Sequence, residues 1–187
     1  MSKQKLLCIV GKSGAGKDAL AKGISEKTGW KQIPSYCDYP PRNDQTEGVE
    51  HTFLTKEQFD EITRTEHIIA YTEINKKRYC TTTELFEKYK SDNPIIYVID
   101  PVGIKNLEDY PHIFDMRIMY VDVPESIRAM RMLGTRHGFN FKERFASENE
   151  SFDNFAKTHH IDYNVINVNE VETTINKLTK DLVKDFS

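Results

Sequence analysis

Two patterns of apolar residues alternate along the chain and predict strands and helices in turn. Near-continuous apolar runs at 6–10, 94–99 and 115–121 are typical of strands buried on both faces of a sheet. Shorter strands are expected at 30–33 and 163–168. Apolar residues at helical spacing follow several of these runs, at 19–28, 125–133 and 171–182. Strands that alternate with helices predict a doubly wound α/β core with a parallel sheet.

The segment between the second and third core strands has a different pattern. Residues 34–50 contain Pro, Gly, Asn and Asp without apolar periodicity, so we expect an irregular loop there. Thr55 and Gln58 form a capping-box pattern that starts a helix. Two strands, at 67–74 and 77–80, and a helix capped by Thr82 or Thr83 complete the segment. We expect a small α+β insertion at 35–92, within a core made of 1–34 and 93–187.

A glycine-rich stretch, Gly-Lys-Ser-Gly-Ala-Gly-Lys-Asp at 11–18, lies between the first strand and the first helix. This context is typical of a phosphate loop, and the alternative is a tight turn with no ligand. Glycines let successive N–H groups point at phosphate oxygens, and the helix N-terminus adds partial positive charge. The predicted nucleotide-binding residues are Gly11, Ser13, Gly14, Ala15, Gly16, Lys17 and Asp18.

Two carboxylates are candidates for binding a metal ion. Asp18 takes the place at which phosphate loops usually carry Ser or Thr, and Asp100 ends the apolar run at 94–99. Carboxylate oxygens are ligands that Mg²⁺ prefers. Each residue also has a purely structural reading, because acidic residues favour a helix start and Asp is a good N-cap.

An arginine-rich segment follows the helix that begins after Pro124. Between 128 and 144 the chain carries one acid among four arginines and a lysine, together with two glycines. Arginines that close over a phosphate stabilise the charge that develops during transfer. We therefore expect a lid at about 134–146 with Arg131, Arg136 and Arg144 as its catalytic residues, and we place Arg128 on the surface. The alternative is a solvated basic surface.

The insertion carries residue types that suit a second phosphate and a base. Ser35, Arg42, His51, Tyr79 and Thr81 offer a guanidinium, an imidazole, a phenol and hydroxyl groups. Loops are often rich in such residues, so spacing alone leaves this reading open.

Composition excludes several classes of protein. The formal net charge of −3 gives no overall attraction to nucleic acid or to a membrane surface. No apolar run reaches the length of a membrane span, and the N-terminus lacks a signal peptide. The 3 cysteines are widely spaced and read as free thiols of a cytoplasmic protein.

Taken together, these motifs and their spacing resemble those of the guanylate kinases, a family within the P-loop nucleoside monophosphate kinases. The resemblance runs from the phosphate loop to the last strand. The matching segments of the acceptor side and the core are Ser35, Pro41-Arg42, Gly48 to Phe53, Tyr79-Cys80-Thr81, Asp100-Pro101-Val102-Gly103, the lid arginines and Asn167.

The resemblance implies a P-loop NTPase core, ATP and Mg²⁺ as donor and metal, and a nucleoside monophosphate as acceptor. Arg42, His51 and Tyr79 would hold the acceptor phosphate. Ser35, Thr81 and Asp100 would bind its base. Asn167 would lie near the adenine of ATP. A monomer or a homodimer is expected, with no nucleic-acid partner.

The chain departs from the family pattern at three positions. Tyr39 stands where the family has a first phosphate-binding arginine, and His51 replaces a tyrosine. Ala70 stands where the family's glutamate reads the guanine edge. Thr72 on the same strand face, or Glu73 if the strand bulges, could substitute for it. The leading function is transfer from ATP to GMP or dGMP. The alternatives are a deoxynucleotide or other monophosphate kinase with altered base specificity, and an inactive guanylate kinase-like interaction module.

Overall fold

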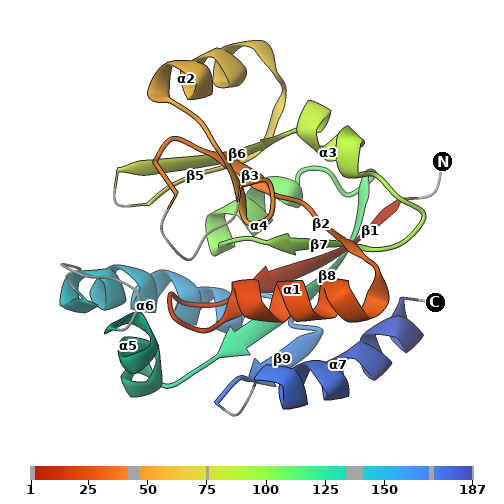
Figure 1. Cartoon of the computed structure of the whole chain (residues 1–187), viewed down its shortest axis with the longest axis vertical. Helices are drawn as coiled ribbons and strands as arrows, with labels where there is room; N and C mark the ends of the chain where they lie inside the picture. Colours follow the sequence, from red (N-terminus) through yellow and green to blue (C-terminus); the bar gives the residue numbers. More distant parts are fainter. Residues whose placement is uncertain (1–2, 42–46, 75, 134–140, 169–170, 187) are drawn as a thin grey trace.

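A computed structural model describes residues 3–41, 47–74, 76–133, 141–168 and 171–186. A five-stranded parallel sheet forms its centre, as the apolar runs predict (Figure 1). The strands lie in the order β2 (Lys31–Gln32), β7 (Ile95–Val98), β1 (Gln4–Val10), β8 (Phe114–Asp122) and β9 (Tyr163–Ile166).

Helices cover both faces of this sheet, so the central strand β1 is buried on each side. Leu7 and Ile9 pack with α1 (Lys17–Thr28) and α7 (Val171–Asp185). Leu6 and Cys8 face the other way, toward α4 (Pro101–Leu107) and α6 (Phe141–Thr158). The fold is therefore α/β, with a parallel sheet flanked by helices. Helix α5 (Glu125–Leu133) follows β8.

A second, smaller sheet lies above the carboxyl end of β7 in Figure 1. Its strands lie in the order β4 (His51–Phe53), β3 (Ser35–Cys37), β6 (Lys77–Thr82) and β5 (Ile68–Ile74), accompanied by α2 (Lys56–Thr65) and α3 (Thr83–Tyr89). The capping box at Thr55 is present, and Thr82 is the N-cap of α3. Strands β3 and β4 run parallel, whereas β6 is antiparallel to β3 and β5.

The expectation of an irregular loop throughout 34–50 is wrong at Ser35–Cys37, which form β3. This strand lies between β4 and β6, and all three of its residues are buried. A strand that is covered on both faces shows no alternation of polar and apolar residues. A run of three residues is also too short for a periodicity to be seen.

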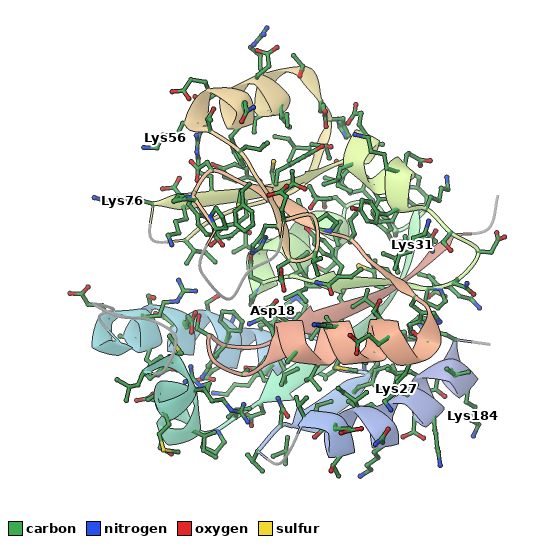
Figure 2. The ribbon with its side chains drawn as sticks, viewed as in Figure 1. Asp18, Lys27, Lys31, Lys56, Lys76 and Lys184 are labelled. Carbon is green, nitrogen blue, oxygen red and sulfur yellow. The ribbon has the colours of Figure 1, made fainter. Side chains whose placement is uncertain are left out.

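Helix α4 connects the two sheets. It begins directly after β7, and the Asn106 side chain accepts a hydrogen bond from Tyr71 N of β5 at 3.0 Å. The insertion is thereby held next to the edge at which the central strands end, the usual place for a ligand in an open α/β sheet. Figure 2 shows Asp18 at the end of α1 nearest the insertion, whereas Lys27, Lys56 and Lys184 project from the periphery.

Within the described ranges, no helix combines the length and the apolar character needed to cross a membrane.

Candidate active site

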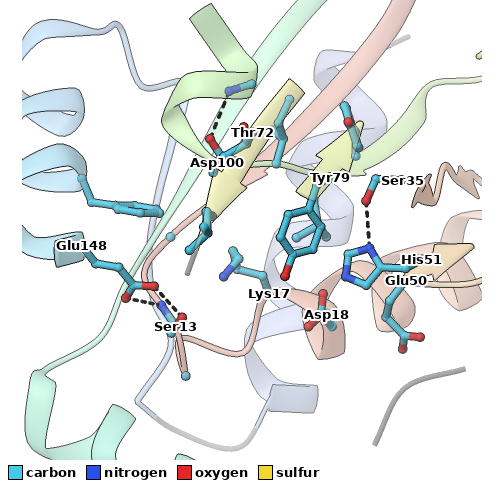
Figure 3. A pocket seen from close by; sticks show the side chains of 18 of the residues that line it. Ser13, Lys17, Asp18, Ser35, Glu50, His51, Thr72, Tyr79, Asp100 and Glu148 are labelled. Carbon is cyan, nitrogen blue, oxygen red and sulfur yellow. Dashed lines mark hydrogen bonds between the residues drawn. The ribbon is translucent and has the colours of Figure 1, made fainter. Parts of the chain in front are cut away.

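A cavity of about 540 Å³ lies between the phosphate loop and the insertion. It is lined on one side by residues of the 11–18 loop and on the other by His51, Tyr79 and Thr72 (Figure 3). This volume is in the range of pockets that bury small organic ligands. Residues far apart in the sequence therefore share one site.

At two positions of the loop, glycine is required both by the backbone φ angle and by a close contact. Gly14 and Gly16 have φ angles of 79° and 86°, in the left-handed region that other residues rarely adopt. A Cβ at Gly14 would lie 2.8 Å from Arg128 O, and one at Gly16 would lie 2.7 Å from Asn167 Nδ2. The backbone can curl around an anion only because these side chains are absent.

Lys17 and Asp18 begin α1 and both line the cavity. Lys17 Nζ donates to Lys12 O at 3.4 Å, across the loop. Figure 3 shows the Lys17 side chain pointing into the cavity below Tyr79. An ammonium in this position can pair with the phosphates of a nucleotide bound to the loop.

Asp100 also lines the cavity, and it is the N-cap of α4. Its Oδ1 accepts hydrogen bonds from Val102 N at 2.8 Å and Gly103 N at 3.1 Å. Among the described residues no group of three or more His, Cys, Asp or Glu could hold a metal ion. Asp18 and Asp100 supply two carboxylates at one cavity, a donor set that suits Mg²⁺ when phosphate oxygens complete its ligands.

Two of the expected lid arginines lie beside the loop and line the cavity. Arg131 of α5 donates from Nη2 to Asn167 O at 2.7 Å and from Nη1 to Ala15 O at 3.4 Å. Arg144 of α6 donates to Ser13 Oγ from Nε at 3.1 Å and from Nη2 at 2.9 Å. Arg136 lies outside the described residues, as does most of the expected lid.

The expectation that Arg128 lies on the surface is wrong. Its side chain is 2% exposed and passes beneath the phosphate loop. Nη1 donates to Ser13 O at 3.1 Å, Nε donates to Val123 O at 3.2 Å, and the guanidinium lies 4.4 Å from the centre of the Phe145 ring. Carbonyl groups and an aromatic face thus take the place of water around this buried guanidinium.

Glu148 of α6 is a site residue that the sequence reasoning missed. It is 5% exposed and lines the cavity, and its carboxylate accepts hydrogen bonds from Ser13 N at 3.0 Å and Ser13 Oγ at 2.6 Å (Figure 3). Arg144 Nε lies 2.6 Å from Oε1. The i, i+4 spacing of Arg144 and Glu148 could have indicated their ion pair. The contact with Ser13 has no signal in the sequence.

Ser35 and His51 come together on the insertion side. They are directly paired in the β3–β4 ladder, and Ser35 Oγ lies 2.8 Å from His51 Nδ1. The His51 ring lies 5.4 Å from the Tyr79 ring and 6.1 Å from the Tyr39 ring, measured between centres. Imidazole, phenol and hydroxyl groups thus converge at one end of the cavity. Arg42 lies outside the described residues.

Tyr39 packs into this aromatic group instead of supplying a cation. It is 7% exposed and lies 5.6 Å from Tyr79 between ring centres. Lys77 Nζ lies 4.3 Å from the centre of the Tyr39 ring, so a cation is present near the place of the missing arginine.

The residues expected to contact the base differ in whether their side chains reach the cavity. Ala70 and Thr72 both line the cavity from β5, opposite Thr81 and Tyr79 of β6. Glu73 alternates to the other face, is exposed and pairs across from Arg78, so the suggestion that it replaces the missing glutamate is wrong. Thr81 is fully buried, outside the cavity lining, with Oγ1 2.5 Å from the hydroxyl of Tyr97.

Two predicted nucleotide-binding residues lie behind the loop rather than in the cavity. Asn167 is 1% exposed and donates from Nδ2 to Ala15 O at 2.9 Å. Ala15 is itself fully buried. Asn167 therefore supports the curvature of the loop from the carboxyl end of β9, and its Oδ1 has no hydrogen-bond partner within the described structure.

Comparisons with known proteins point to one family. A family model described as guanylate kinase matches residues 3–185. The guanylate kinase of Clostridium acetobutylicum is 27% identical, with 99% of this chain and 88% of that protein aligned. The guanylate kinase of Fusobacterium nucleatum is 31% identical over 55% of this chain. The aligned region spans 56% of the Fusobacterium protein and 64% of a Polaromonas guanylate kinase that also matches.

The fold agrees with a solved guanylate kinase structure. The crystal structure of guanylate kinase from Anaplasma phagocytophilum superposes with a TM-score of 0.72, covering 99% of this chain and 87% of that one at 17% identity. At this identity the likeness concerns the fold.

Proposed function

The chain belongs to the guanylate kinase family, and from this premise we propose that it transfers the γ-phosphoryl group of ATP to GMP or dGMP. The observation that carries the proposal is the shared cavity. The phosphate loop with Lys17 lines one side, and His51 and Tyr79 line the other. A donor and an acceptor can therefore be held next to each other in one site.

On the donor side, the loop binds the phosphates of ATP. Its N–H groups, the start of α1 and Lys17 provide positive charge along the chain of phosphates. Arg131 and Arg144 approach the same loop from α5 and α6, where they can stabilise the charge that spreads over the moving phosphoryl group.

Asp18 and Asp100 are the proposed ligands of Mg²⁺, which when bound neutralises part of the phosphate charge. The cavity lining supports this assignment. The described lining residues comprise four cations, Lys17, Lys22, Arg131 and Arg144, and four carboxylates, Asp18, Glu50, Asp100 and Glu148. Such a balanced lining accepts a polyanion more readily together with a divalent cation.

On the acceptor side, no general base is needed, because the attacking oxygen belongs to an anionic phosphate. The task of the protein is to position that oxygen in line with the γ-phosphorus. His51 and Tyr79 can donate hydrogen bonds to the acceptor phosphate, and Arg42 is proposed to join them. Ser35 holds His51 in place through the 2.8 Å contact.

Base selection is the point at which this chain differs most from its family. Guanine presents N–H donors that need an acceptor, and Ala70 offers none. Thr72 is 7% exposed on the same strand face and lines the cavity, so its hydroxyl is the proposed replacement. The alternative role of Asp100, in place of metal binding, is a second contact to the base.

The test is ADP release with Mg-ATP and a panel of GMP, dGMP, AMP, CMP, UMP, TMP and the remaining deoxynucleotides. We expect turnover with GMP or dGMP. Turnover with another base would leave a monophosphate kinase but overturn the guanine assignment. If the chain binds ATP but shows no turnover across the panel, the proposal that it is an enzyme would be overturned and an interaction module would be favoured.

A further inference from the structure

Glu148 of α6 is a buried carboxylate that contacts the phosphate loop, and the proposed transfer reaction assigns it no role. Its side chain is 6% exposed, and both of its oxygens accept hydrogen bonds from Ser13. A buried carboxylate costs several kcal/mol unless it is paired and hydrogen-bonded. Its position therefore depends on its partners.

Two arginines supply the opposite charge. Arg144 Nε lies 2.6 Å from Oε1, and Arg128 Nη1 lies 3.8 Å from Oε2. Arg128 is itself held by Ser13 O and by the Phe145 ring. A second carboxylate, Glu125, lies 4.0 Å from Arg128 Nη2, but its side chain is 59% exposed. The buried part of the cluster therefore has two positive groups and one negative group, so an anion can still bind beside it.

Ser13, Arg144 and Glu148 form a closed set of contacts. Each of the three touches the other two, since Arg144 also donates to Ser13 Oγ. These contacts use Nε and Nη2 of the guanidinium. Among the described residues nothing accepts from its Nη1, and Arg144 lines the cavity. The arrangement restrains a long side chain while one donor edge remains available.

We infer that Glu148 is a positioning residue, which holds Arg144 beside Ser13 so that the guanidinium meets the terminal phosphate of ATP. This inference rests on the proposed function for the role of Arg144. The contrary reading is that the carboxylate competes with phosphate for the loop. The two readings predict opposite effects of removing the negative charge.

The experiment compares wild type, Glu148→Gln, Arg144→Ala and the double variant. Glu148→Gln retains the size of the side chain and can still hydrogen-bond Ser13, but it loses the charge that holds Arg144. We expect kcat to fall about tenfold and the KM for ATP to rise, because the guanidinium meets the terminal phosphate already in the bound ground state. In the Arg144→Ala background the same change should lower kcat by less than about twofold, because the two residues act as a unit.

A binding measurement tests the role of Glu148 without requiring that the protein transfers phosphate to a monophosphate. Calorimetric titration with ADP and with a non-hydrolysable ATP analogue gives the preference of each variant for the terminal phosphate. Glu148→Gln should reduce that preference, and the reduction should vanish without Arg144. A wild-type chain that shows the preference but transfers to no monophosphate would overturn the proposed function alone.

Asp153→Asn is the matched control. Asp153 also joins α6 to the loop, through an ion pair of 2.6 Å with Lys12, but its side chain is 53% exposed. Exposed pairs contribute little, so kcat should stay within about twofold of wild type. Glu148→Asp keeps the charge and should fall between wild type and Glu148→Gln. It also serves if the amide variant does not fold, as judged by circular dichroism.

Two results would overturn the inference. One is tighter binding of the ATP analogue by Glu148→Gln, which would mean that the carboxylate competes with phosphate. The other is an equal loss of kcat with and without Arg144, which would mean that Glu148 acts on the fold or on another group.

Discussion

The hydroxyl oxygens of Thr81 and Tyr97 lie 2.5 Å apart and join the insertion to the central sheet. Thr81 belongs to β6 and Tyr97 to β7, and both are buried. Burial raises the pKa of Tyr97 far above its usual range, only partly offset by the hydrogen bond with Thr81. Tyr97 therefore stays protonated at ordinary pH, and the contact persists.

Removing this contact should weaken the fold. Tyr97→Phe leaves Thr81 Oγ1 buried without that partner, and we expect the free energy of unfolding to fall by about 1–2 kcal/mol. Urea denaturation measures the change. Tyr110→Phe is the control, because its hydroxyl contacts His67 at an exposed position, 3.1 Å from Nε2. An equal loss of unfolding free energy in both variants would show that the buried hydrogen bond contributes no more to stability than the exposed one.

Lys17→Ala should abolish transfer while the fold stays intact. The ammonium at the start of α1 is proposed to pair with the phosphates of ATP, and we expect kcat to fall by at least about a thousandfold. Steady-state ADP release measures the loss, and circular dichroism checks folding. Lys27→Ala removes an exposed lysine of the same helix and should keep full activity. A Lys17→Ala variant with wild-type rates would contradict the phosphate-loop assignment.

Ala70→Glu should raise the preference for guanine. A carboxylate on this face of β5 can accept from guanine N1 and N2, and we expect the kcat/KM for GMP relative to AMP to rise about tenfold. Competition assays with both nucleotides measure the ratio. Glu73→Ala, on the opposite face of the same strand, should leave it unchanged. If Ala70→Glu had no effect, another residue would read the base.

Arg78 ties three parts of the insertion together, and its loss should destabilise the protein. Nε lies 2.6 Å from Asp38 Oδ2, Nη1 lies 2.5 Å from Asp60 Oδ1, and the guanidinium lies 4.6 Å from the centre of the Phe59 ring. The Asp38 side chain is 4% exposed. Arg78→Ala would leave it buried without its cation, at a cost of about 3 kcal/mol in unfolding free energy.

Thermal and urea denaturation would measure this cost. Arg64→Ala is the matched control, since Arg64 pairs with Glu61 on the exposed side of α2 and should change stability by less than about 0.5 kcal/mol. Similar losses in both variants would contradict a special role for Arg78.

The buried cysteines should make stability fall at alkaline pH. Burial raises the pKa of Cys37 and of Cys80 to about 12, from an ordinary value of 9.0. Above pH 9.0 the unfolded thiols lose protons that the native thiols keep, so the unfolded state is favoured progressively up to about pH 12. Below pH 9.0 both states are protonated, and these thiols give no pH dependence.

Urea midpoints from pH 7 to 10 measure the slope, with the Cys37→Ser, Cys80→Ser double variant as the control. The double variant should show a shallower decline above about pH 9. An identical slope in both proteins would show that other groups dominate.

Local patterns were sufficient to predict most of the fold and one side of the site. The apolar runs at 6–10, 94–99 and 115–121 correspond to β1, β7 and β8, because a buried parallel strand needs apolar residues throughout. The phosphate loop could be recognised because its glycines, its lysine and its flanking elements are contiguous. The capping box at Thr55 could be predicted because its two residues are also close in the sequence.

Long-range packing determined the remaining features. Arg128 is buried because carbonyl groups of Ser13 and Val123 accept its hydrogen bonds, which no pattern around residue 128 reveals. Thr81 is hydrogen-bonded to Tyr97, and Glu148 accepts a hydrogen bond from Ser13, which is 135 residues away in the chain. Whether a polar side chain faces solvent, a ligand or a buried partner depends on what the fold brings opposite it, and that is a property of the packed chain rather than of its local sequence.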